Sequence, residues 1–441
     1  MTASSTWSRR STGWSTAARS AFGRLWLSTT VSQLGTQVSE LAVPFIAIVT
    51  LHATPFQIGM LMAVEYAPIV VFSLPAGAWV DRLPRRPLLI ASDLGRAAIL
   101  LSLPAAYALG WLSLAQLYVV GFGVGSLSVL FDAAYQSYLP ALVDRDRLLS
   151  ANSKLQISDQ GASVVGPTLA GSLISLLTAP FAVAADAVSY LLSAGLLSSI
   201  RRAEPSPSQQ ARPAGILREI SDGFRYVVGH PILRTLVMTS GIMQFFGRMA
   251  MAILLVYLVR EVGLNAAVVG TLFSFGSVGF VLGALIAPHV TSRLGLGRTL
   301  ASAASLASVG PLFYAISPRH LAGLFVAAGF FIYGVAALVW TVNSLSLRQA
   351  VTPSAQLGRT SATIRLLSWG AIPLGSVIGG LLGSTVGLRQ TLVIGACGAL
   401  AASLPVHLSR IRRLSSLDDV ATRVWRRSAG PDSGQCAEHL Q

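Results

Sequence analysis

Three charged side chains, those of Glu40, Glu65 and Arg248, lie deep inside long apolar runs of this 441-residue sequence. Glu40 follows Arg24 by sixteen residues, and Glu65 precedes Asp81 by the same number. If both runs are helices with a rise of about 1.5 Å per residue, each carboxylate lies ~24 Å from the helix end that these charges mark. An unpaired carboxylate in an apolar core is costly unless it binds a proton. The spacing therefore predicts two proton-binding groups at a similar depth.

Arg248 is a candidate counter-charge for these acids. It follows Arg234 by fourteen residues, or ~21 Å of helix. Its side chain does not reach back to that helix end, so we expect it to pair with a carboxylate or with an anionic group of a substrate. Glu40 is the partner that we expect. Two alternatives stay open, in which Arg248 extends to the opposite lipid headgroups and Glu65 makes a structural hydrogen bond.

Further polar residues within the apolar runs are candidates for lining a cavity. The amides among them are Gln33, Gln37, Gln244 and Asn343. Hydrogen bonds between helices would explain these amides equally well. Asp186 is either a cavity residue or a polar anchor, and Trp369 either lines the cavity or packs against lipid. We expect an ion-pair network near the opposite helix ends from Asp93, Arg96, Asp132 and Asp159.

The elements that hold such residues must cross a membrane. Hydrophobic residues make up 53% of the sequence and charged residues 11%, with a mean hydropathy of +0.64, whereas soluble domains contain about 25% charged residues. We therefore predict an all-α membrane protein with twelve transmembrane helices in two pseudo-symmetric six-helix bundles. The apolar runs lie at 24–50, 58–80, 88–110, 115–137, 154–178, 181–200, 232–258, 267–289, 299–317, 321–345, 361–385 and 390–408.

The basic residues predict the orientation of these spans. The net charge is +15, but the loops on one side carry only Arg260, Arg319 and Arg389, so the positive-inside rule places both termini in the cytoplasm. The charge therefore does not indicate nucleic-acid binding. We predict a cytoplasmic N-terminal tail, a first six-helix bundle, a cytoplasmic linker with an amphipathic helix, a second bundle and a cytoplasmic C-terminal tail, at 1–23, 24–200, 201–231, 232–408 and 409–441.

A charged loop motif follows the second predicted helix. It has the form G-x-x-x-D-R-x-x-R-R and consists of Gly77, Asp81, Arg82, Arg85 and Arg86. The helix dipole disfavours an anion at the C-terminal end of a helix, so Asp81 needs a compensating partner. With the six-plus-six layout, the motif resembles that of the major facilitator superfamily. The resemblance implies that this loop gates the cytoplasmic side, and a solvated turn that only sets the topology is the alternative.

A glycine–proline motif lies in the fifth predicted helix and consists of Gly161, Gly166, Pro167 and Gly171. It is similar to the motif of the drug:proton antiporters of that superfamily, although Ala170 stands where a second glycine is usual. Proline permits a bend and glycines permit close packing against a helix of the other half, which suits rocking of the halves. Ordinary small-residue packing is the alternative. The stretches 91–96 and 131–140 resemble siderophore and macrolide exporters.

Together these features predict a transporter that works by alternating access. We expect it to export a small amphiphilic organic molecule, such as a drug, a siderophore or a secondary metabolite, in exchange for protons. The alternatives are uptake by symport and a non-transporting membrane sensor on the same scaffold. We expect a monomer in the lipid bilayer of the bacterial cytoplasmic membrane. The sequence contains no G-x-x-x-x-G-K-[ST], H-E-x-x-H, C-x-x-C or G-x-S-x-G motif, so it does not predict an enzyme, a metal site or a cofactor.

Overall fold

The computed structural model describes residues 16–80, 82–144, 147–201, 216–353 and 356–416. Within these ranges every regular element is a helix, which confirms the predicted all-α class. The expectations for residues 1–15, 202–215 and 417–441, and for Asp81, fall outside the described residues.

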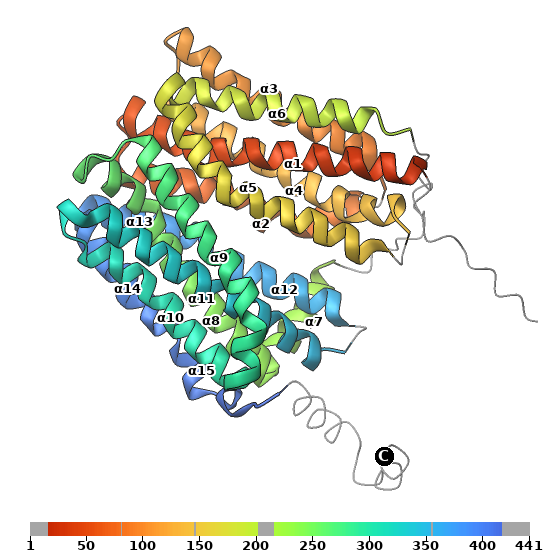
Figure 1. The fold of residues 1–441 in the computed structure, drawn as a ribbon, viewed down its shortest axis with the longest axis vertical. Coiled ribbons are helices and arrows are strands. Elements are labelled where there is room, and N and C mark those ends of the chain that lie inside the picture. The colour runs from red at the N-terminus through yellow and green to blue at the C-terminus, as the bar shows by residue number, and fades with distance from the viewer. Residues whose placement is uncertain (1–15, 81, 145–146, 202–215, 354–355, 417–441) are drawn as a thin grey trace, which may run out of the picture.

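Six long helices form the first half of the molecule (Figure 1). α1 packs against α5 and α6, α3 packs against α4 and α6, and α2 packs against α4. Ser113 begins α4 as an N-cap, because its hydroxyl accepts a hydrogen bond from the amide of Gln116. The bounds are α1 Thr16–Phe45, α2 Pro55–Val80, α3 Arg85–Ala108, α4 Leu114–Leu142, α5 Leu148–Leu177 and α6 Ala179–Ser198.

The second half is built in a similar way. α9 packs against α11, α10 against α11 and α14, and α8 against α13 and α14. α1 and α8 occupy corresponding positions, and each continues into a π-helical turn, Ile46–Thr50 and Tyr257–Glu261. The bounds are α8 Pro231–Val256, α9 Ala266–Leu294, α10 Leu296–Ile316, α11 Ala322–Val351, α12 Leu357–Trp369, α13 Ala371–Thr385, α14 Leu388–Ala401 and α15 Leu404–Leu408.

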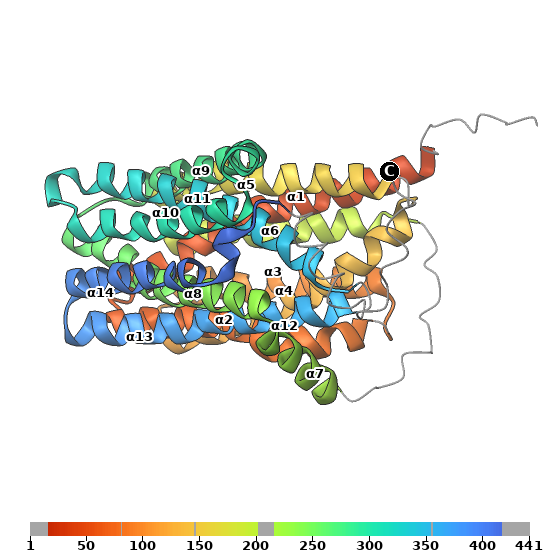
Figure 2. The same cartoon turned by 90° about the horizontal axis from the view of Figure 1, so that it is seen from below.

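A short helix, α7 (Ile216–Gly229), lies beside α12 and projects from the bundle in Figure 2. Its sequence alternates apolar and charged residues at helical spacing. Val227 is buried and Phe224 is exposed. The hydroxyl of Tyr226 donates a hydrogen bond to the carbonyl oxygen of Val351, over 3.4 Å. α7 therefore ties the chain before α8 to the end of α11.

Eleven helices within the described ranges are long and apolar enough to cross a membrane. α12 and α13 together contribute one of these spans, over Thr360–Thr385. The remaining predicted run, 24–50, corresponds to α1 and its π-helical turn. α1 is as long as its neighbours but falls below the hydropathy of a span, because it carries many Ser, Thr and Gln residues together with Glu40. The count is thus close to the predicted twelve.

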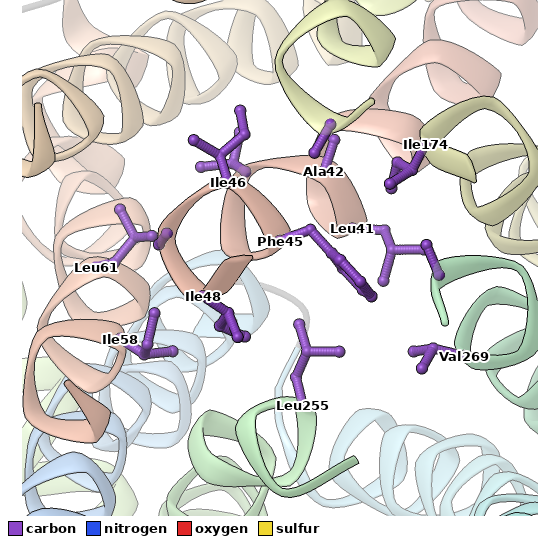
Figure 3. Packing of buried hydrophobic residues seen from close by; sticks show 14 of the residues in the cluster. Leu41, Ala42, Phe45, Ile46, Ile48, Ile58, Leu61, Ile174, Leu255 and Val269 are labelled. Atoms are coloured by element: carbon purple, nitrogen blue, oxygen red, sulfur yellow. The ribbon is translucent and has the colours of Figure 1, made fainter. Parts of the chain in front are cut away.

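The two halves meet at one end of the molecule, which we call the converging end and which holds Pro55, Gly171, Gly270 and Gly380 (Figure 1). A single cluster of buried apolar residues extends across both halves there. Figure 3 shows Leu255 of the second half and Phe45 of the first among its side chains. At the opposite, open end the apolar residues form two separate clusters, one in each half.

Glycine lets the backbones of the two halves approach closely at the converging end. A Cβ added to Gly270 on α9 would lie 2.1 Å from the carbonyl oxygen of Pro167 on α5. A Cβ on Gly171 would lie 2.3 Å from the carbonyl oxygen of Ala266. α2 and α13 cross in the same manner, where a Cβ on Gly59 would lie 2.3 Å from a backbone oxygen of Ser376. Two such crossings therefore hold the halves together in lipid.

We predict that Gly270→Ala loosens the converging end. The added methyl group meets a backbone carbonyl that cannot move aside, and overpacking of this kind costs about 1–3 kcal/mol. In a background without Cys397 and Cys436, a cysteine in place of buried Leu255 should react about tenfold faster with a water-soluble maleimide in the Gly270→Ala protein.

Gly161→Ala is the matched control, because a Cβ at Gly161 meets nothing within 4 Å. Equal labelling rates in the two alanine variants, both folded by size-exclusion chromatography, would show that the α5–α9 crossing does not hold the converging end.

Candidate functional site

A cavity of about 750 Å³ lies in the second half. Its walls come from α8, α9, α10, α11 and α12, because these helices turn small, aromatic and cationic residues inward. Its charged lining residues are Arg248, Arg348 and Arg365. Its aromatic lining residues are Phe273, Phe280, Tyr314, Phe330, Tyr333, Trp340 and Trp369. Gln244 also lines this cavity, as does Gly247 beside Arg248.

Arg248 reaches across to the first half. Its Nη1 donates a hydrogen bond to the hydroxyl of Tyr66 on α2, over 3.2 Å. Its guanidinium also lies over the Tyr66 ring, 4.7 Å from the ring centre. Glu40 and Glu65 are close enough to Arg248 to interact with it electrostatically, but neither lies within the 4.0 Å of an ion pair. Arg248 therefore contacts Tyr66 directly, whereas it interacts with the two carboxylates only electrostatically.

Glu40 lies on α1 with its side chain exposed, and it interacts electrostatically with Arg248 of the second half. One of its carboxylate oxygens accepts a hydrogen bond from the Gln37 amide, over 3.2 Å. Gln33 is exposed on the same helix, one heptad before Glu40. α1 thus presents a polar stripe rather than a lipid-facing apolar surface, in agreement with its low hydropathy.

Glu65 is half-buried on α2, beside α4. Its side chain fills the space that the missing side chain of Gly121 leaves, since a Cβ there would lie 2.8 Å from Glu65 Cγ. Within the described ranges its carboxylate makes no hydrogen bond or ion pair. Because Glu65 interacts electrostatically with both Glu40 and Arg248, the three charges form one electrostatic group.

Asp186 and Asn343 lie away from the cavity. Asp186 is buried between α6 and α1, where it accepts hydrogen bonds from the hydroxyls of Ser39, over 2.5 Å, and Ser189, over 3.1 Å. Asn343 is buried between α11 and α9, where it accepts a hydrogen bond from Thr291, over 2.8 Å. Both residues therefore join neighbouring helices of one half.

Among the described residues, two members of the predicted network of four charges form an ion pair. Asp93 and Arg96 form a buried ion pair on α3. The Arg96 guanidinium lies between the rings of Phe131 and Tyr190, 4.5 and 4.1 Å from their centres. Asp132 is exposed on α4 and Asp159 half-buried on α5, and Asp132 interacts electrostatically with both Arg96 and Arg365.

Arg86 of the loop motif, together with Arg24 of α1, binds within the first half. Arg86 donates hydrogen bonds to the carbonyl oxygens of Leu197 and Ser198 at the end of α6, and Arg24 donates one to Ser199. These cations compensate the C-terminal carbonyl groups of α6. Arg82 is exposed and Arg85 half-buried. Asp81 and the side-chain surroundings at position 77 lie outside the described part of the chain.

The glycine–proline motif has several different neighbours. Gly171 and Pro167 contact α9 at the converging end, while Gly166 packs against Gln37 of α1. α5 continues as one helix through Pro167. Immediately after the proline, the amide and hydroxyl of Thr168 both donate hydrogen bonds to the hydroxyl of Ser274 on α9, over 2.9 and 2.8 Å. At this motif the two halves are therefore held together both by close backbone packing and by hydrogen bonds.

Sequence reasoning did not identify Tyr66, Ser274, Arg348 or Arg365 as site residues, and it assigned Arg260 only to a loop. Nη2 of Arg260 donates hydrogen bonds to two carbonyl oxygens of the first half, those of residues 48 and 53, each over 2.9 Å. The position of Arg365 inside a predicted span was a signal for a cavity residue, just as it was for Arg248. Arg348 lies three residues past the predicted end of its span, so it was counted as a loop charge.

We predict that Tyr66→Leu destabilises the protein more than Tyr66→Phe. Phenylalanine keeps the ring beneath Arg248 and loses only the hydroxyl, whereas leucine loses both contacts. The difference in free energy of unfolding in detergent should be about 0.5–2 kcal/mol. The difference should become smaller in an Arg248→Gln background, where only the packing of the ring remains, and equal costs for the two substitutions in the wild-type background would contradict the stacked contact.

The chain is similar to known membrane proteins over most of its length. A family model described as transmembrane secretion effector matches residues 11–430. The chain is 27% identical over 383 residues to the uncharacterized MFS-type transporter YfiS of Bacillus subtilis (strain 168). This match covers 85% of this chain and 89% of YfiS. The chain is 25% identical over 409 residues to the enterobactin exporter EntS of Shigella boydii serotype 18, covering 89% of this chain and 94% of EntS.

Solved structures share the fold. A bacterial homologue of the iron transporter ferroportin in its inward-facing state has a TM-score of 0.74 at 17% identity, over 88% of this chain and 98% of that one. The outward-facing state of such a homologue has a TM-score of 0.59 at 18% identity, over the same shares. The chain belongs to the transmembrane secretion effector family and is a multi-pass membrane transporter of the major facilitator superfamily, with small-molecule substrates rather than enzymatic chemistry.

Proposed function

We propose that this transporter exports a small amphiphilic organic molecule in exchange for protons, by alternating access. The observation that carries the proposal is the group formed by Glu40 and Glu65 of one half and Arg248 of the other. Rocking of the halves would change the distance between Arg248 and both carboxylates. A carboxylate near Arg248 in one conformation and far from it in another binds a proton with different affinity in the two.

The energy available to such an exchange is sufficient. Moving one elementary charge across 100 mV of membrane potential supplies about 2.3 kcal/mol, before any pH difference is added. The similarity to an enterobactin exporter supports export as the direction, and it supports siderophores among the amphiphilic molecules that the cavity could take. Uptake by symport is the competing direction, and it predicts accumulation in right-side-out vesicles instead.

We place both termini in the cytoplasm of a bacterial cell, with the chain acting as a monomer in the cytoplasmic membrane. The open end of the molecule carries Arg24, Arg86 and Arg348, whereas the converging end carries Arg260. This distribution supports an open end that faces the cytoplasm. The two halves, 24–200 and 232–408, would then rock about the converging end, with the linker 201–231 on the cytoplasmic side.

The loop motif after α2 would act as the cytoplasmic gate in this scheme. Arg86 ties the start of α3 to the end of α6, which gives the loop a rigid support. Asp81 would close against the second half when the open end shuts. Gly77, Arg82 and Arg85 would complete the motif.

We predict that Glu40→Gln abolishes transport driven by a proton gradient. Inverted vesicles with an acidic interior should accumulate a fluorescent amphiphilic dye when they contain the wild-type protein. With Glu40→Gln, accumulation should fall to the level of vesicles without the protein, because glutamine cannot bind and release the proton. Exchange of dye across the membrane without a gradient should persist.

Glu261→Gln is the matched control. Glu261 lies in the π-helical turn after α8 and faces the exposed Arg319 at 3.8 Å, so the same loss of charge occurs outside the cavity. Gradient-driven accumulation that survives in Glu40→Gln would remove Glu40 as a proton carrier.

A further inference from the structure

The cavity has an unusual charge distribution. Arg248, Arg348 and Arg365 line it, and no Asp, Glu or Lys residue is among its described lining residues. Three guanidinium groups without a carboxylate in the same wall favour an anionic occupant. The wall is thus chemically distinct from that of a cavity that binds organic cations.

The three arginines are not equally engaged. Arg248 already contacts Tyr66 by a hydrogen bond and by its ring. The Nε of Arg348 is buried and has no hydrogen-bond partner within the described residues. Arg365 is exposed, and its charge interacts with Asp132 of the facing half. A buried donor without an acceptor is costly, so Arg348 is the residue that most needs a ligand oxygen, with Arg365 beside the same cavity.

Aromatic rings line much of the cavity wall. The rings of Phe273 and Phe330 meet edge to face at 4.9 Å between centres, and Tyr314 and Phe330 lie 5.1 Å apart. Phe280 and Tyr333 form a further edge pair at 6.1 Å. Such surfaces favour a flat apolar body. The volume of about 750 Å³ is within the range of sites for small organic ligands.

We propose that the transported substrate is an aromatic anion, whose negative group binds Arg348 and Arg365 while its rings pack among Phe280, Phe330 and Tyr333. This deepens the proposed function, since it rests on the cavity being the transport site. The acids of the facing half, Glu40, Asp132 and Asp159 among them, would then repel the anionic group and hold it against the second half. A cationic substrate would instead lie against that acidic wall and leave Arg348 without an acceptor.

Three probes that share one ring system and differ in charge test the proposal. Naphthalene sulfonate is the anion, naphthalene sulfonamide the neutral analogue and naphthylmethylammonium the cation. Their affinities are measured by calorimetry with the full-length protein in nanodiscs, with empty nanodiscs subtracted and no proton gradient present. The sulfonate should bind at least about tenfold more tightly than the sulfonamide, which corresponds to about 1.4 kcal/mol, and the cation should bind most weakly.

Single arginine variants then locate the binding. Arg348→Gln should weaken sulfonate binding several-fold and leave sulfonamide binding unchanged, and Arg365→Gln should do the same to a smaller extent. Arg298→Gln is the control. Arg298 is exposed at the start of α10, outside the cavity, and its substitution removes the same charge. Trp340 and Trp369 line the cavity, so quenching of their fluorescence provides a second readout if a variant gives too little protein for calorimetry.

Equal affinities for sulfonate and sulfonamide, tighter binding of the cation, or a wild-type affinity in Arg348→Gln would each overturn the proposal. These outcomes are separable from those of the proton-coupling test. Gradient-driven dye accumulation without anion selectivity would leave the exporter and remove the substrate class. Selective anion binding without gradient-driven accumulation would leave the binding site and remove the proton coupling.

Discussion

The close contact of backbones at the converging end is the constraint on which the rest of the structure depends. In lipid, apolar side chains gain little from meeting each other, because lipid tails are equally apolar. Two halves therefore stay together through tight packing at Gly171 and Gly270 and through a few hydrogen bonds, such as that between Thr168 and Ser274. The opposite end has two separate apolar clusters instead of one, so the halves spread there.

This geometry also determines where charge can lie. A charged group in lipid is expensive, so ionisable residues within the spans collect between helices or beside the cavity. Arg96 is enclosed by two aromatic rings and Asp93, inside one half. Arg248 instead lies where both halves approach it. The surroundings of Arg96 stay the same when the halves move as rigid bodies, whereas those of Arg248 change. Of the two arginines, only Arg248 is therefore suited to couple the movement of the halves to a change in charge.

Much of the fold could be predicted from the sequence, because hydropathy and length define most spans directly. α1 was harder to identify as a span, because the polar residues around Glu40 lower its hydropathy, the property that identifies the neighbouring helices. Counting residues also led us to expect a common depth for Glu40, Glu65 and Arg248, which interact electrostatically in the structure. Counting does not give the rotation of a helix about its axis. For that reason the buried, intra-half positions of Asp186 and Asn343 were left open between two interpretations, and the ring of Tyr66 was missed altogether.

The bonds of Arg260 carry a consequence for how this family can diverge. Both acceptors are main-chain carbonyl oxygens, at Ile48 and Ala53, so replacement of either side chain leaves the contact available. The glycine crossings are the opposite case, because there the absence of a side chain is itself the requirement. We therefore expect the side chains at positions 48 and 53 to vary freely among homologous chains, whereas the crossing positions should remain glycine. Low overall sequence identity is then compatible with the same packing at the converging end.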